Sequence, residues 1–196
     1  MCIRDRAGWI YNSSENLDFL SAGETISFSY TVVASDDSGA GNAVSAPQTV
    51  TITLTGTNDA PVLSFATGND AGAVQEDTTL SVDGQFSSAD IDHDATATWT
   101  INGSPTGTYG AIAVDNTGKW TYTLANGTNG VASAVQLLKA GESHDEVFTV
   151  QVSDGLGGVD TQLVTVTITG SNDAPVLSFA AGNEAGAVQE LSLIHI

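Results

Sequence analysis

The sequence predicts an all-β protein built from tandem β-sandwich modules, one of them complete and two partial. The stretch TITLTGTNDAP at 51–61 recurs as TVTITGSNDAP at 165–175, so that Asn58 and Asn172 lie 114 positions apart. Self-similarity at a fixed period indicates an array, and this period suits a whole small domain rather than one turn of a solenoid. Short runs rich in Thr, Val, Ile and aromatic residues, separated by Gly, Asn and Asp, predict strands joined by turns.

The repeat sets the domain boundaries. Three short motifs of the complete module also occur near the start of the chain: GWIY at 8–11 beside KWTY at 119–122, AGE at 22–24 beside 140–142, and FSYTVV at 28–33 beside FTVQV at 148–152. Residues 7–57 are therefore interpreted as the C-terminal half of one module, residues 58–171 as a complete module, and residues 172–190 as the start of the next. We expect the chain to be a window from a longer array.

The two terminal hexamers break the repeat. They are MCIRDR at 1–6 and LSLIHI at 191–196, and the repeat predicts Asp-Thr-Thr where Leu-Ser-Leu follows Glu190. We interpret both as translated sequencing-adapter read-through and exclude them from the fold reasoning. A divergent native terminus is the alternative, and genomic DNA that encodes LSLIHI would refute the artefact.

The strands of the complete module follow from its pattern. The first is predicted in two pieces, at 61–65 and 73–75, because glycines interrupt it. Alternation of apolar and polar residues predicts the others at 78–86, 96–101, 110–114, 119–124, 147–152 and 161–169. Asp83-Gly84 indicates a bulge. The apolar spacing of Val131, Val135 and Leu138 predicts one helix over 131–139.

Seven short strands, expected to be antiparallel, with polar turns between them are typical of a β-sandwich of immunoglobulin or cadherin-like type. The segments DNTG at 115–118 and DGLGG at 154–158 have the composition of tight turns. The large side chains at strand positions form the expected core: Trp99, Trp120, Tyr122 and Phe148. A module of this size buries enough apolar surface to fold alone.

The chain is strongly acidic, with 23 Asp and Glu against 4 Lys and Arg and a net charge of −19. It lacks the basic patch that phosphate binding needs, which excludes nucleic acid and anionic membranes as partners. No apolar run approaches the roughly 18 residues of a membrane-spanning helix, and no signal peptide is visible. The single cysteine, Cys2, lies in the first hexamer, so disulfides do not stabilise the modules and a bound metal is an alternative.

The sandwich topology sorts the acidic and amide side chains onto two ends of the module, because consecutive strands reverse direction. The upstream end, where the linker arrives, is expected to hold Asn58, Asp59, Asp90, Asp92, Asp94 and Asp154. The downstream end is expected to hold Glu76, Asp77, Glu142, Asp145, Asn172 and Asp173. Carboxylates gathered without basic partners destabilise one another, whereas Ca²⁺ takes about 6–8 oxygen ligands. We therefore predict Ca²⁺ at each junction, between the downstream end of one module and the upstream end of the next.

The acidic loop at 90–94 departs from the common calcium motifs. Asp90, Asp92 and Asp94 resemble positions 1, 3 and 5 of an EF-hand, but Ala95 stands where that loop has Gly and Ile101 where it has the bidentate Glu. The segment GLGGVD at 155–160 misses the nonapeptide GGxGxD and occurs once, which excludes a β-roll. A solvated acidic loop without metal is the alternative.

Several motifs together carry a family resemblance: TVTITGSNDAPV at 165–176, QED at 75–77, ADID at 89–92, YG at 109–110, GKWTY at 118–122, LKAGE at 138–142 and VSDG at 152–155. With them, nearly all of residues 7–190 resembles VCBS-type repeats, cadherin-like modules of large bacterial secreted proteins that are often adhesins exported by type I secretion. The resemblance implies a β-sandwich extender with a role in surface attachment or biofilm.

The resemblance also implies a calcium role for particular positions, namely Glu76, Asp90, Asp92, Asn58/Asp59 and Asn172/Asp173. The linker departs from the classical cadherin linker, which has acid or amide residues where this chain has Gly56-Thr57 and Ala60. The number of ions per junction therefore stays open.

We expect a spacer of a secreted or cell-surface bacterial adhesin and not an enzyme. Its partners would be the neighbouring repeats, with cell-surface or matrix glycans and proteins as further candidates. A calcium-dependent carbohydrate- or partner-binding module is the alternative, and it predicts an exposed aromatic cluster beside 90–94. An enzyme predicts a deep pocket with convergent polar groups, and no HExxH, GxSxG, Walker A or dinucleotide motif is present. His93 and His144 are interpreted as surface residues rather than zinc ligands.

Overall fold

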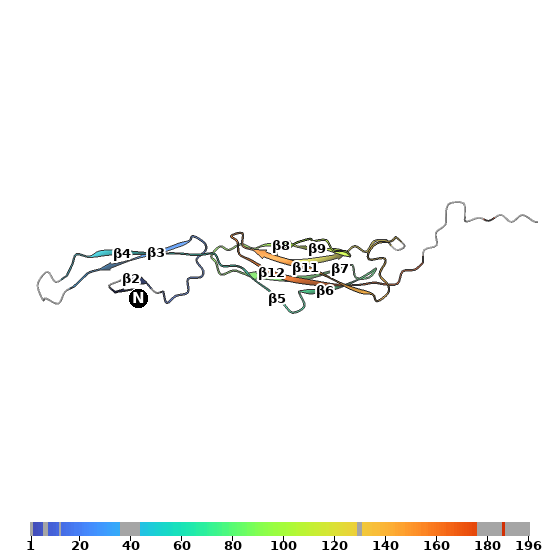
Figure 1. Cartoon of the computed structure of the whole chain (residues 1–196), viewed down its shortest axis with the longest axis horizontal. Coiled ribbons are helices and arrows are strands. Elements are labelled where there is room, and N and C mark those ends of the chain that lie inside the picture. Colours follow the sequence, from blue (N-terminus) through green and yellow to red (C-terminus); the bar gives the residue numbers. More distant parts are fainter. Residues whose placement is uncertain are drawn as a thin grey trace, which may run out of the picture.

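The structure, a computed structural model, describes residues 2–5, 8–11, 13–35, 44–128, 131–175 and 186. The described part is elongated, with β1 to β4 at one end and β5 to β12 in the longer body that follows (Figure 1). Every regular element within the described ranges is a β-strand. The predicted all-β class with sandwich modules is confirmed.

The first part of the chain forms two hairpins. One pairs β1 (Cys2–Asp5) with β2 (Gly8–Tyr11), and the other pairs β3 (Thr25–Val32) with β4 (Gln48–Thr55), both antiparallel. The ring of Tyr11 lies 5.0 Å from that of Phe28, so the two hairpins contact each other. β1 lies within the hexamer at 1–6, whose sequence is interpreted as adapter read-through.

The complete module is a sandwich of two four-stranded sheets. One has the order β5 (Val62–Phe65), β7 (Ser81–Ala89), β10 (Lys119–Leu124), β9 (Gly110–Val114). The other has the order β6 (Ala71–Gln75), β12 (Val159–Thr169), β11 (Ser143–Ser153), β8 (Thr98–Asn102). The bounds of β9 and β10 agree with the prediction. β11 begins four residues earlier than predicted, because pairing with β12 from Ser143↔Thr169 onward recruits a polar stretch that has no alternation of its own.

The broken first strand is confirmed, and its two pieces join different sheets. β5 pairs antiparallel with β7, whereas β6 pairs parallel with β12 along Ala71↔Thr165 to Gln75↔Thr169. The expectation that all strands are antiparallel is therefore wrong. Gly68, with φ of 91°, lies in the turn between the two pieces and allows the chain to cross from one sheet to the other. Because β12 lies far from β6 in the sequence, no local pattern in either strand indicates that the two pair.

The core lies between the two sheets. Its fully buried side chains come from both: Val74, Phe86, Trp120, Tyr122, Val150, Val164, Val166 and Ile168. Along β10 and β12 the inward positions alternate with outward ones, as the sequence pattern predicts. Each large apolar side chain buried in this way contributes about 1.5–3 kcal/mol. Three of the four predicted core residues are buried, and the fourth, Trp99, is partly buried against the same cluster.

Two local predictions are wrong. The segment 131–139 forms turns and not a helix. Val135 and Leu138 are buried in the core, whereas Val131, expected on the same face, is 60% exposed. The two buried side chains account for the apolar spacing without a helix. Asp83-Gly84 is not a bulge, because β7 pairs with β10 without interruption there. A Cβ at Gly84 would lie 2.6 Å from Trp120 Cζ2, so close packing of the indole explains this glycine.

A buried carboxylate holds the loop before β9 against the core. Glu146 is 9% exposed, and its Oε1 accepts the main-chain N–H groups of Thr108 and Tyr109, the latter at 2.9 Å. Its Oε2 accepts the hydroxyl of Tyr122 at 2.7 Å. The carboxylate therefore satisfies three donors at once, of which the Tyr122 hydroxyl is buried.

We expect Glu146→Ala to lower the free energy of unfolding by about 2–3 kcal/mol, because it removes the acceptor of the buried Tyr122 hydroxyl and of two main-chain N–H groups. Asp145→Ala is the matched control: its exposed side chain accepts only the Thr167 hydroxyl, and a change of about 0.5 kcal/mol is expected. Urea unfolding in metal-free buffer measures both. Equal midpoints for the two variants would contradict the role of Glu146.

Alkaline pH gives a second test. Burial, reinforced by the hydrogen bond to Glu146 and its charge, raises the pKa of Tyr122 well above its ordinary value of 10.0. The neutral hydroxyl is favoured in the folded state, so this stabilisation is complete below about pH 10 and is lost progressively above it. We expect Tyr122→Phe to flatten the decline of unfolding free energy above pH 10. The same slope for Tyr122→Phe and wild type would refute this.

Candidate metal centre at the module junction

The acidic loop after β7 is shaped by its own side chains. Asp90 Oδ1 accepts the Asp92 main-chain N–H at 3.0 Å, and the Ala95 N–H donates to the Asp92 carbonyl at 3.3 Å. Asp94 has a φ of 57°, a left-handed conformation that Asp adopts more readily than most residues. The DxDxD pattern thus folds into a compact turn at the upstream end of the sandwich.

The linker that arrives from the first part of the chain is hydrogen-bonded to two loops of the complete module. The Asp59 main-chain N–H donates to Asp92 Oδ2 at 2.9 Å. The Asn58 amide donates to Asp154 Oδ2 at 2.7 Å. The structure therefore brings the linker, the loop after β7 and the turn between β11 and β12 together.

Asp154 organises the turn between β11 and β12. Its Oδ1 accepts the N–H groups of Leu156 at 2.7 Å and Gly158 at 3.0 Å. The side chain is buried, at 6% exposure. The hydrogen bond from Asn58, helped by those turn N–H groups, lowers the pKa of Asp154 despite the opposing effect of burial. Asp154 is thus held as a carboxylate.

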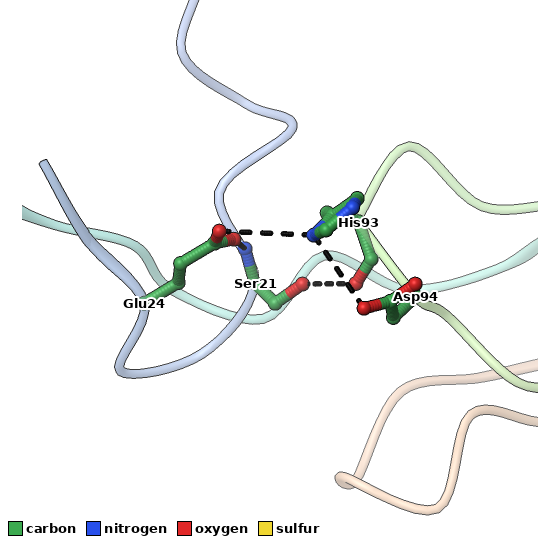
Figure 2. Close-up of polar contacts among 4 residues, drawn as sticks. All are labelled: Ser21, Glu24, His93 and Asp94. Carbon is green, nitrogen blue, oxygen red and sulfur yellow. Dashed lines mark hydrogen bonds and ion pairs between the residues drawn. The ribbon is translucent and has the colours of Figure 1, made fainter.

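A cavity of about 550 Å³ opens at this junction, and both parts of the chain line it. The complete module contributes Asn58, the acidic loop 90–96 and the turn 154–156. The first part contributes Ser21 and Glu24. Figure 2 shows these two residues facing His93 and Asp94 across the junction. Neither was named from the sequence, although Glu24 repeats as Glu142, which was.

The downstream end is built on Glu76, which is fully buried. Its Oε2 accepts the Ser171 N–H at 2.8 Å, at the start of the next linker. Asp77, with φ of 62°, exchanges two hydrogen bonds with Asn126, at 2.9 and 2.8 Å. The main-chain carbonyl of Asp173 accepts a hydrogen bond from the side-chain amide of Asn172 at 3.2 Å.

The other two acids of this end have partners of their own. Glu142 accepts the Lys139 N–H at 3.1 Å and lies 3.0 Å from His144 Nε2, and these two contacts, the His144 bond first, lower the pKa of Glu142. Asp145 accepts the Thr167 hydroxyl at 2.6 Å on the sheet surface. These contacts account for both side chains without a metal.

Among the described residues, six side-chain oxygens are buried with no hydrogen-bond partner. One is Gln136 Oε1, whose amide nitrogen donates to the Asn126 carbonyl, and the other five come from the predicted site residues of the two ends. These five are Asn58 Oδ1, Asp90 Oδ2 and Asp92 Oδ1 upstream, and Glu76 Oε1 and Asp173 Oδ1 downstream. Buried polar atoms are normally paired, so each of these calls for an explanation. A hard divalent cation takes this kind of donor, since carboxylate and amide oxygens are the ligands of Ca²⁺. The donor set therefore fits calcium.

Neither end is a finished metal site. In the described ranges no three His, Cys, Asp or Glu side chains come together in an arrangement that would hold an ion. The repeat equivalent of Glu76 would fall before residue 1, and that of Asp90 would fall after residue 196.

The family model of the bacterial cadherin-like domain matches residues 58–170, which covers the complete module and its upstream linker. The chain belongs to the bacterial cadherin-like domain family. Cadherin-like domains are extracellular adhesion modules rather than enzymes, and they generally bind Ca²⁺. No helix in the described residues has the length and apolar character of a membrane span.

Solved structures similar to this bacterial cadherin-like chain include two animal cadherins. Drosophila N-cadherin EC1-4 has a TM-score of 0.48 and 18% identity over 88% of this chain and 40% of that one. The human Desmocollin-1 ectodomain has a TM-score of 0.39 and 18% identity over 75% of this chain and 28% of that one. The S-layer protein SbsC domains 4 and 5 have a TM-score of 0.29 and 15% identity, over 86% and 79%. This chain thus spans less than half of either cadherin, and no curated protein matches it.

We expect Asn58→Ala to raise the pKa of Asp154 toward its ordinary value, because the Asn58 amide is the main cause of its depression. The stabilisation from Asp154 is present above about pH 4 and lost as pH falls further, so the variant should lose less of its stability on acidification. Carboxyl NMR titration in metal-free buffer measures the pKa. Asn102→Ala, which removes an amide bonded to Gln151, is the control. An unshifted Asp154 in Asn58→Ala would contradict the assignment.

Proposed function

We propose that this chain is part of a calcium-stabilised extender of a large secreted bacterial surface adhesin, which serves cell adhesion or biofilm and leaves the cell by type I secretion. The observation that supports it best is the set of five unpartnered buried oxygens at opposite ends of one module. When modules are joined end to end, those two ends meet.

The repeat suggests how the two halves combine. A linker such as Asn58-Asp59 contacts the upstream end of the module that it enters, through Asp92 and Asp154. Its copy Asn172-Asp173 follows Ser171, whose N–H is bound by Glu76 of the module that it leaves. One linker would thus bring Glu76 and Asp77 to the copies of Asp90, Asp92, Asp94 and Asp154 in the next module.

The charge balance supports a structural use of this centre. Apart from the terminal hexamers, the chain has only Lys119 and Lys139 to set against its carboxylates. Bound Ca²⁺ would supply the positive charge that these side chains lack. Without it, repulsion opposes packing of the modules. This suits modules without cysteine in 7–190 that cross a secretion channel unfolded and fold outside the cell.

The alternative is a calcium-dependent carbohydrate- or partner-binding module. It needs an exposed aromatic cluster beside the loop at 90–94. Among the described residues, the cavity at that loop is lined by acids, an amide, a histidine, Leu156 and small side chains, with no Phe, Tyr or Trp. One exposed aromatic residue, Phe19, lies beside the loop, and a single ring is not a cluster. The spacer therefore has the better support.

A chain that carries two consecutive copies of residues 58–171 would complete one junction. We expect it to bind Ca²⁺ with a Kd of about 10⁻⁴–10⁻³ M. Small-angle scattering should give a longer, stiffer particle with Ca²⁺ than with EGTA. No heat of binding, together with identical scattering profiles, would reject the proposal.

Isosteric variants locate the centre. We expect Glu76→Gln and Asp92→Asn in both copies to weaken Ca²⁺ binding at least about tenfold. Asp115→Asn is the control, because that carboxylate lies in the turn between β9 and β10 and is bonded to Thr117. Calorimetric titration measures all three. Equal affinity in the control and in both test variants would move the site elsewhere.

A further inference from the structure

The junction also contains a direct contact that needs no metal. The His93 main-chain N–H donates to the Phe19 carbonyl at 2.9 Å, and the Ser21 hydroxyl donates to the His93 carbonyl. His93 Nδ1 lies 3.7 Å from Glu24 Oε1 (Figure 2). Both hydrogen bonds use the main chain of His93, so this contact tolerates other side chains at position 93.

The segment that receives His93 is a tight corner at 17–24, which leads into β3. Its copy at 135–142 leads into β11 in the same way. Each internal hydrogen bond of the first corner has a counterpart in the second: Leu20 N to Leu17 O at 3.0 Å beside Leu138 N to Val135 O at 3.0 Å, and Ser21 N to Glu24 Oε2 at 3.2 Å beside Lys139 N to Glu142 Oε2 at 3.1 Å. The two corners therefore have the same conformation.

The glycine that follows the paired strand, β4 or β12, holds each corner in the same way. Gly23 and Gly141 both have a φ of 78°, which non-glycine residues rarely adopt. Gly23 donates to Gly56 O at 3.1 Å, and Gly141 donates to Gly170 O at 3.1 Å. Whatever surface the first corner offers to the next module, the second corner offers in the same geometry.

We propose that the corner at 135–142 is a docking surface for a following copy of this module, which it holds through main-chain hydrogen bonds to the residue equivalent to His93. Leu137 stands where Phe19 stands in the observed contact and is 70% exposed. Lys139 stands where Ser21 stands and offers an ammonium in place of the hydroxyl.

The charges of the two surfaces favour a following copy of this module as the partner of the corner. Lys139 is one of only two basic residues in 7–190, and the loop that would face it has the sequence DIDHD. A lysine opposite three aspartates is complementary, and repulsion from the remaining carboxylates disfavours other contacts of the acidic surface. The inference goes beyond the proposed function, because the contact would orient consecutive modules whether or not calcium is bound.

Amide hydrogen exchange of the full chain in EGTA, followed by NMR, tests the contact. We expect the His93 amide to exchange at least about tenfold more slowly in wild type than in Ser21→Ala, since one anchoring hydrogen bond is lost. His93→Ala should keep the protection of amide 93, because the main chain makes the contact. Ser29→Ala is the matched control: it removes a hydroxyl bonded to Thr51, away from the junction.

Ser21→Lys places the residue of the second corner in the first. We expect it to protect amide 93 within about threefold of wild type. Loss of protection to the level of Ser21→Ala would show that the second corner does not dock in this way. Amides of β4 report whether each variant is folded, and wild-type exchange of amide 93 at the random-coil rate in EGTA would overturn the proposal by itself.

Exchange measured with and without Ca²⁺ distinguishes the docking surface from the calcium-stabilised spacer. Protection of amide 93 that appears only after Ca²⁺ is added would make the contact a product of the metal centre, and the docking surface would be rejected while the spacer stands. If amide 93 is protected in EGTA and the two-copy chain binds no Ca²⁺, the docking surface stands and the calcium-stabilised spacer is rejected.

Discussion

The linker between modules is held by two aspartates, and the geometry of the junction depends on this. Asp92 accepts the main-chain N–H of Asp59, and Asp154 accepts the amide of Asn58. Because Asp92 follows β7 in one sheet and Asp154 joins β11 to β12 in the other, the linker is fastened to both layers of the sandwich. A linker fastened in this way transmits the orientation of one module to the next.

The module satisfies its buried carboxylates in two different ways. Glu146 receives two main-chain N–H groups and the Tyr122 hydroxyl, so the protein alone meets its needs. Glu76 is as deeply buried and receives only the Ser171 N–H on one oxygen. The first arrangement is a closed hydrogen-bond network that stabilises the core. The second leaves one carboxylate oxygen with unused acceptor capacity at the end of the module, where the next module would begin.

Two kinds of interaction therefore meet at one junction. The carboxylates of the loop at 90–94 carry charge that the chain itself does not balance, while the main chain of the same loop bonds directly to the corner at 17–24. The balance of the carboxylate charge depends on cations in the surrounding solution, whereas the main-chain hydrogen bonds do not. The loop at 90–94 would thus serve both the stiffness and the direction of an array.

The sequence alone determined the repeat, the sandwich class, most strands and the gathering of acids at two ends, because alternation and turn composition are local properties and chain reversal sorts the loops. Asp59 and Asp92 were expected at one end and lie within a hydrogen bond of each other there. Only the tertiary structure decided that β6 pairs parallel with β12, that 131–139 forms turns, and that Ser21 and Glu24 face His93. Those facts depend on contacts between residues far apart in the chain, for which local periodicity carries no information.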